Sequence, residues 1–142
     1  MGEGLVVNVE SLNQKVQFRG IARDNAAITV DYSPPLGDGQ GYTSLELLLV
    51  SLATCSASTV VTLLRQDGRT VSALQVRASG VRRTQHPTAF ESIALAFTFH
   101  SPDATAEDVD RAMRISRDAV CPVWAMVKGN VAIATSFEIV AE

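Results

Sequence analysis

Cysteine, histidine, aromatic and charged residues are scarce in this chain. Its 142 residues include two Cys, two His, five Phe, two Tyr and one Trp, and 19% are charged. The two cysteines, 66 positions apart, and two poorly spaced histidines do not make a four-ligand zinc site. A net charge of −3 without any run of Lys or Arg argues against nucleic acid as a partner.

Targeting and membrane signals are also missing. The opening residues, Met1-Gly2-Glu3-Gly4, have no basic region followed by an apolar run, so we expect a cytoplasmic protein. The 20 residues Leu45–Leu64 carry one charge, Glu46, and match the length of a membrane span. Six Ser and Thr residues make this segment too polar for lipid, which predicts a helix buried on most sides and no membrane partner.

The length of 142 residues predicts one domain over residues 1–142, and 46% of the residues are hydrophobic. Alternating patterns predict strands, and a loop (connector or lid) follows at 34–41. The expected strands are Leu5–Val9, Lys15–Arg19, Ala26–Tyr32, Leu74–Arg82, Phe90–Phe99 and Val131–Val140. The elements together predict an α+β fold, with antiparallel sheets around the long central helix.

Three helices are expected between these strands. The long one begins at a capping box, with Thr43 as N-cap and Glu46 three residues later, and Gly68 ends it. A second helix spans about Ala106–Ala119, and Pro122 interrupts its pattern and starts a short run over Pro122–Val127.

The two cysteines are the residues most able to carry chemistry. Cys121 directly precedes Pro122, so we expect it at a helix N-cap, where free backbone N–H groups lower a thiol pKa. Cys55 lies in mid-helix among small residues that allow close approach. Each is also explained as a small buried apolar residue, so the residues alone leave both interpretations open.

Two motifs carry a family resemblance. Ser44–Cys55, SLELLLVSLATC, is similar to the P-x-E-L-L-x-x-x-L-A-x-C helix of the OsmC/Ohr family of thiol-dependent peroxidases. Ala119–Val123 resembles that family's second cysteine motif, x-C-P-V, and the element order agrees from about Val16 to Val140. Within this family, the chain resembles the OsmC-like branch, which has a compact N-terminal hairpin, more than it resembles the best-studied organic hydroperoxide reductases.

The resemblance implies an OsmC-like fold in an intertwined homodimer. It further implies a peroxiredoxin-like enzyme of the oxidative stress response that reduces organic hydroperoxides. Cys55 would become a sulfenic acid, Cys121 would form a disulfide with it, and an external dithiol of lipoyl type would reduce that bond. This chemistry implies no metal and no cofactor. The alternative is an OsmC-like redox-sensing or small apolar ligand-binding protein with little turnover.

The family also pairs a catalytic arginine with a helix glutamate. Glu46 matches the glutamate, and either Arg19 or Arg23 lies in the hairpin that supplies the arginine. A capping role explains Glu46 equally well. The sequence departs from the pattern at Ser44, where proline is usual, and at Trp124, where a small residue is common.

Overall fold

The computed structural model describes residues 2–142, which fall into two compact units. One unit ends at Leu48 and the other runs from Leu49 to Glu142, so the boundary lies inside helix α1(Ser44–Gln66). The fold class is α+β, as predicted, with two three-stranded sheets.

The first unit holds the antiparallel sheet β1-β2-β3, built from β1(Asn8–Ser11), β2(Phe18–Ile21) and β3(Ile28–Val30). All three strands were predicted, but β1 and β2 begin three residues later than expected. Strand β2 begins late because the preceding residues form a turn, in which the Asn13 side chain accepts hydrogen bonds from the N–H groups of Lys15 and Gln17, at 2.9 and 3.2 Å. This turn sets the hairpin register.

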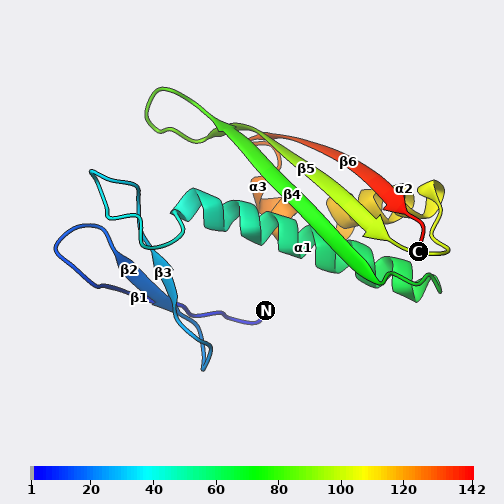
Figure 1. Cartoon of the computed structure of the whole chain (residues 1–142), viewed down its shortest axis with the longest axis horizontal. Coiled ribbons are helices and arrows are strands. Elements are labelled where there is room, and N and C mark those ends of the chain that lie inside the picture. Colours follow the sequence, from blue (N-terminus) through cyan, green and yellow to red (C-terminus); the bar gives the residue numbers. More distant parts are fainter. Residues whose placement is uncertain (1) are drawn as a thin grey trace. The chain divides into compact units, whose positions relative to one another are not determined.

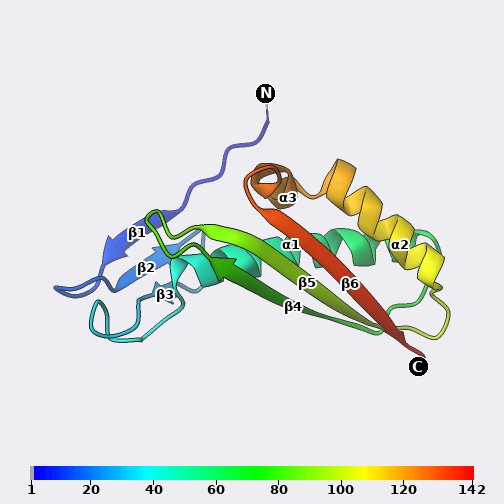
Figure 2. The same ribbon diagram turned by 90° about the horizontal axis from the view of Figure 1, so that it is seen from above.

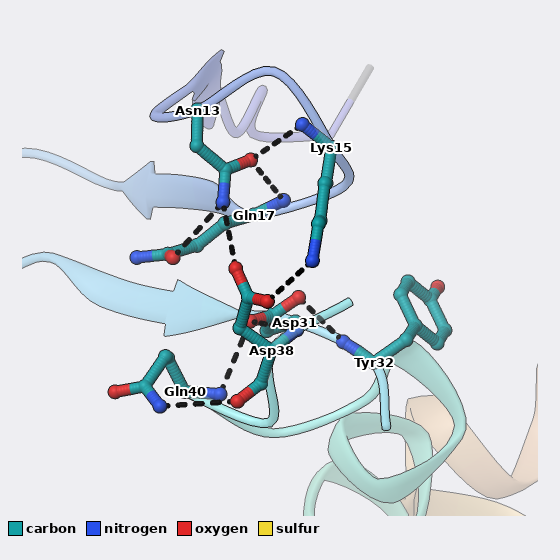
Figure 3. Close-up of polar contacts among 7 residues, drawn as sticks. All are labelled: Asn13, Lys15, Gln17, Asp31, Tyr32, Asp38 and Gln40. Carbon is teal, nitrogen blue, oxygen red and sulfur yellow. Dashed lines mark hydrogen bonds and ion pairs between the residues drawn. The ribbon is translucent and has the colours of Figure 1, made fainter. Parts of the chain in front are cut away.

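The loop after β3 is organised by the carboxylate of Asp31, which is fully buried (Figure 3). Its oxygens accept hydrogen bonds from the backbone N–H groups of Tyr32, Asp38 and Gln40, at 2.8, 3.2 and 3.1 Å. Lys15 forms an ion pair with Asp38 at 2.6 Å. Burial favours the neutral acid, but the three amides and Lys15 together hold the pKa of Asp31 below its usual value. The loop is therefore a structured connector.

Both predicted ends of α1 are confirmed. The Thr43 N–H donates to Glu46 Oε1 at 2.8 Å, and the Glu46 N–H donates to Thr43 Oγ1 at 3.2 Å, which is a complete capping box. Gly68 adopts a φ of +81°, the left-handed conformation that ends a helix at low steric cost.

Within a single chain, α1 is buried along one stripe. Leu52, Ser56, Val60 and Leu64 are the buried residues, and a spacing of four places them on one helix face. Val50, on another face, is 47% exposed. The prediction that this helix is buried on most sides is therefore wrong for the single chain, in which one face of α1 is buried. By length and composition α1 could cross a membrane, but its buried stripe belongs to the hydrophobic core.

The second unit is a sheet with the strand order β4-β5-β6, covered by helices (Figure 1). Strand β4(Ala73–Arg82) pairs antiparallel with β5(Phe90–His100), as predicted. The expected antiparallel pairing of the last strand is wrong, because β6(Ala132–Val140) runs parallel to β5. A parallel pair needs a long crossover, and the chain passes through α2(Ala106–Ile115) and α3(Pro122–Val127) between the two strands (Figure 2).

That crossover contains three helical segments: α2(Ala106–Ile115), a π-helix η1(Ser116–Val120) and α3(Pro122–Val127). The predicted helix Ala106–Ala119 therefore stops being an α-helix at Ile115. The Cys121 N–H donates to the Ser116 carbonyl five residues back, which widens the last turn. The start of α3 at Pro122 is confirmed.

Candidate active site

The two cysteines meet inside the second unit. Cys55 lies on α1, Cys121 immediately precedes α3, and their Sγ atoms are 3.1 Å apart as free thiols. The two thiols share a hydrogen bond across this distance. A disulfide has an S–S distance of about 2.05 Å, so a bond needs a further approach of about 1 Å.

Cys121 is held rigidly by its surroundings. It occupies the N-cap of α3, as predicted, and its Sγ accepts a hydrogen bond from the Trp124 N–H at 3.4 Å. Its side chain is 1% exposed, and Ser56 Oγ lies 3.9 Å from its sulfur. Solvent therefore reaches this thiol far less than it reaches Cys55, which is half-buried.

The thiol of Cys55 is shifted towards its neutral form. Burial is the main cause that raises its pKa, and the hydrogen bond and charge of Cys121 add to the shift. A hydrogen bond from the backbone of Val123 acts in the opposite direction. Among residues 2–142, the groups that set this pKa include no cation.

A groove beside Cys55 could receive a substrate. Its volume is about 550 Å³, and the residues around it come from α1 and from the segment that holds Cys121. The lining is Cys55, Ser58, Thr59, Thr62, Leu63, Gln66, Val120 and Pro122. Methyl and methylene groups from these side chains suit an organic molecule, and the Cys55 thiol is the reactive group on the wall.

Glu46, Arg19 and Arg23 all belong to the first unit, where each has its own local role. Arg19 Nε forms an ion pair with Glu10 at 3.1 Å across the β1-β2 hairpin. Arg23 takes a φ of +57° in the turn between β2 and β3. Glu46 accepts the Thr43 N–H in the capping box. The single chain thus does not join Glu46 to either arginine in an ion pair, and their catalytic roles stay predictions.

Sequence reasoning did not identify the groups that support the thiols. Val123 and Trp124 supply backbone N–H donors because they are the second and third residues of α3. The Cys-Pro pair that starts this helix was enough to predict both donors. Ser56 was not predictable as a neighbour of Cys121, because the packing of α1 against α3 decides it. In the described part of the chain, no three His, Cys, Asp or Glu side chains form a metal-binding group.

Comparison with known proteins gives consistent matches. A family model described as "OsmC-like protein" matches residues 37–136. Protein YhfA of Escherichia coli (strain K12) is 32% identical over 97 residues, which cover 68% of this chain and 72% of that protein.

Solved structures share the fold over nearly the whole chain. A hypothetical protein from Aquifex aeolicus VF5 has a TM-score of 0.88 at 26% identity, with 99% of each chain covered. An OsmC like protein from Mycoplasma pneumoniae has a TM-score of 0.84 at 22% identity, again with 99% of each chain covered. The organic hydroperoxide resistance protein OhrB of Bacillus subtilis has a TM-score of 0.64 at 13% identity, covering 94% of this chain and 98% of that one.

Proposed function

This chain belongs to the OsmC-like family, and on that premise we propose that it is a thiol-dependent peroxidase that reduces organic hydroperoxides. The observation that carries the proposal is the pair of free thiols with sulfurs 3.1 Å apart, one of which opens onto a groove. Two cysteines 66 positions apart in sequence need a specific fold to meet in this way. The similarly folded organic hydroperoxide resistance proteins support the substrate class.

The proposed cycle uses both sulfurs. The Cys55 thiolate attacks the terminal oxygen of the hydroperoxide, the O–O bond breaks, and the alkoxide takes a proton and leaves as an alcohol. Cys55 is then a sulfenic acid. The Cys121 thiolate attacks that sulfur, the S–O bond breaks, and the hydroxide takes a proton and leaves as water. An external dithiol of lipoyl type supplies two electrons and two protons, regenerates both thiols and itself becomes a disulfide.

The exposure of the two thiols supports this order of roles. Cys55 is half-buried and lines the groove, so a peroxide can reach it, whereas Cys121 is buried and suited to attack from within the protein. The proposal also includes a cation that stabilises the Cys55 thiolate. The family pattern assigns this role to Arg19, with Arg23 as the alternative, and Glu46 would orient the arginine. Such a cation would offset the burial that raises the pKa of Cys55.

Stopped-flow oxidation with cumene hydroperoxide tests the proposal. We expect the wild-type protein to lose both thiols rapidly and to form one intramolecular disulfide, detected by mass spectrometry. Cys55→Ser should abolish the reaction. Cys121→Ser should still form a sulfenic acid, which dimedone traps, but no intramolecular disulfide. The proposal fails if Cys55→Ser reacts as fast as the wild-type protein.

A second candidate function is a redox-sensing or apolar ligand-binding protein with little turnover. The raised pKa of Cys55, and the lack of a cation among the described groups that set it, favour this alternative. Peroxide consumption would then be slow even with excess dithiol. Native mass spectrometry should recover a bound apolar molecule, whereas rapid turnover with an empty protein would exclude this function.

We also propose a cytoplasmic homodimer. In the single chain, the first unit exposes five large apolar side chains to water: Leu5, Val6, Val7, Val9 and Ile28. Beside them lies an apolar groove of about 400 Å³. An exposed patch of this kind is typical of a protein interface. Sedimentation equilibrium should give twice the chain mass of 15.2 kDa, and a monomer at all concentrations would contradict the proposal.

A further inference from the structure

A second cavity in the same unit shares no lining residue with the groove. Its volume is about 210 Å³, and α1, α2, η1, α3, β5 and β6 all contribute to its wall. Ser56 lines this cavity while its neighbour Cys55 lines the groove. Consecutive helical residues point about 100° apart, so the two spaces lie on different sides of α1.

The wall of the cavity includes a buried hydroxyl group that has no hydrogen-bond partner among the described residues. Ser116 is 2% exposed, and its Oγ has no hydrogen-bond partner among the described residues. Ser56, 1% exposed, also lines this space, and the weak partner of its hydroxyl is the Cys121 sulfur at 3.9 Å. On burial, such a hydroxyl loses its hydrogen bonds to water and gains none from the protein. A polar group of a bound molecule would restore one, so the Ser116 hydroxyl favours a polar ligand in this cavity.

Aromatic side chains also line the cavity. Phe97, Phe137 and Trp124 all line it, and Phe97 and Trp124 are 2% and 5% exposed. Rings arranged around a small space contact another ring by offset or edge-to-face packing. This volume is smaller than the roughly 300–1,000 Å³ typical for drug-sized ligands. A single six-membered ring therefore suits it.

Two partly exposed arginines also line the cavity. The side chains of Arg114 and Arg117 are 56% and 42% exposed, and both line the cavity. Arg114 donates one N–H to Asp110, and Arg117 donates two to Asp118. Each guanidinium has five N–H donors, so both keep donors for an anion. Guanidinium groups bind carboxylates in a bidentate manner.

Because Ser116 is buried and both arginines are partly exposed, we propose that the cavity binds a small aromatic carboxylate with a hydroxyl group at the far end of its ring. The carboxylate contacts Arg114 and Arg117, the ring packs against the aromatic side chains, and the hydroxyl pairs with Ser116. This site is separate from the peroxide groove and does not require the proposed thiol chemistry.

The test uses the full chain and 4-hydroxybenzoate as the probe. Trp124 is the only tryptophan and lies in the wall, so its fluorescence reports occupancy, and isothermal titration calorimetry measures affinity. We expect saturable binding that is weaker for benzoate, which lacks the hydroxyl, and for 4-hydroxybenzyl alcohol, which lacks the charge. Losing one charge-assisted contact should weaken binding about tenfold.

Two variants and one control locate the bound probe. Arg114→Gln should weaken 4-hydroxybenzoate about tenfold but leave 4-hydroxybenzyl alcohol unchanged. Ser116→Ala should remove the preference for 4-hydroxybenzoate over benzoate. Arg83→Gln, an exposed arginine outside the cavity, should change neither. No saturable binding, equal binding of the neutral alcohol, an unaffected Arg114→Gln protein, or a crystal soaked with the probe that shows only water in the cavity would each overturn the proposal.

Discussion

Glu46 has two possible roles, and a pair of substitutions separates them. As a helix cap, its carboxylate accepts the Thr43 N–H at 2.8 Å, while Thr43 Oγ1 accepts the Glu46 N–H at 3.2 Å. As a catalytic partner, it would hold an arginine at the site through its negative charge. Thr43→Ala removes only the cap. Glu46→Gln keeps an acceptor for the Thr43 N–H but removes the charge.

The two variants should lose similar stability. An N-cap threonine contributes about 1 kcal/mol, and a negative charge in the first helical turn contributes about 0.3–1 kcal/mol. Scanning calorimetry should therefore show Tm falling by about 4 °C or less in both variants. Because the costs match, any difference in activity comes from the charge and not from the stability of the helix.

Their peroxidase rates should differ strongly. A hydrogen bond between charged groups is worth about 1.5–3 kcal/mol, and about 1.4 kcal/mol is a tenfold change in rate. We therefore expect Glu46→Gln to lose at least about tenfold in kcat/KM for cumene hydroperoxide, and Thr43→Ala to stay within about twofold. If Glu46→Gln keeps the full rate, Glu46 is only a cap. Equal losses in both variants would show that activity follows helix stability.

Three further predictions concern the thiols, the core and the loop. Cys121→Ala removes a hydrogen bond and a charge that raise the pKa of Cys55, so the pH midpoint of its alkylation by iodoacetamide should fall; an unchanged midpoint would leave burial as the sole cause. Leu52→Ala, at a fully buried position, should cost about 2–5 kcal/mol in urea unfolding, and a loss below about 1 kcal/mol would contradict its place in the core. Asp31 has a lowered pKa when folded, so it stabilises the protein above its unfolded pKa of about 3.9 and loses this effect as pH falls through the folded value. The Tm advantage of the wild-type protein over Asp31→Asn should therefore shrink in acid, and a constant difference would argue against ionised Asp31 as the acceptor.

Local signals in the sequence were enough to predict most elements. The capping box at Thr43 and Glu46 and the stop at Gly68 placed α1, because these interactions form within a few residues of each other. Cys121 before Pro122 placed an N-cap for the same reason. The first hairpin was displaced because the hydrogen bonds of the Asn13 turn set its register, and strand periodicity does not reveal such a turn.

Long-range packing decided the rest. The parallel pairing of β6 with β5 depends on how the crossover returns to the sheet, and the strand pattern is the same for either direction. The end of α2 at Ile115 depends on the hydrogen bond from the Cys121 N–H to Ser116, five residues back. Neither feature has a periodic signature in the sequence.

The sequence by itself determined which two residues could form a redox couple, because cysteine is rare in this chain and each cysteine sits in a distinctive helical context. Only the tertiary structure decided that the two sulfurs lie 3.1 Å apart, since their distance depends on packing α3 against α1. The same packing buries Cys121, leaves Cys55 on an open groove and raises the pKa of Cys55. The residue type determines that a thiol is present. Whether the two thiols can form a disulfide depends on the distance between their sulfurs, and the protonation of Cys55 depends on its burial.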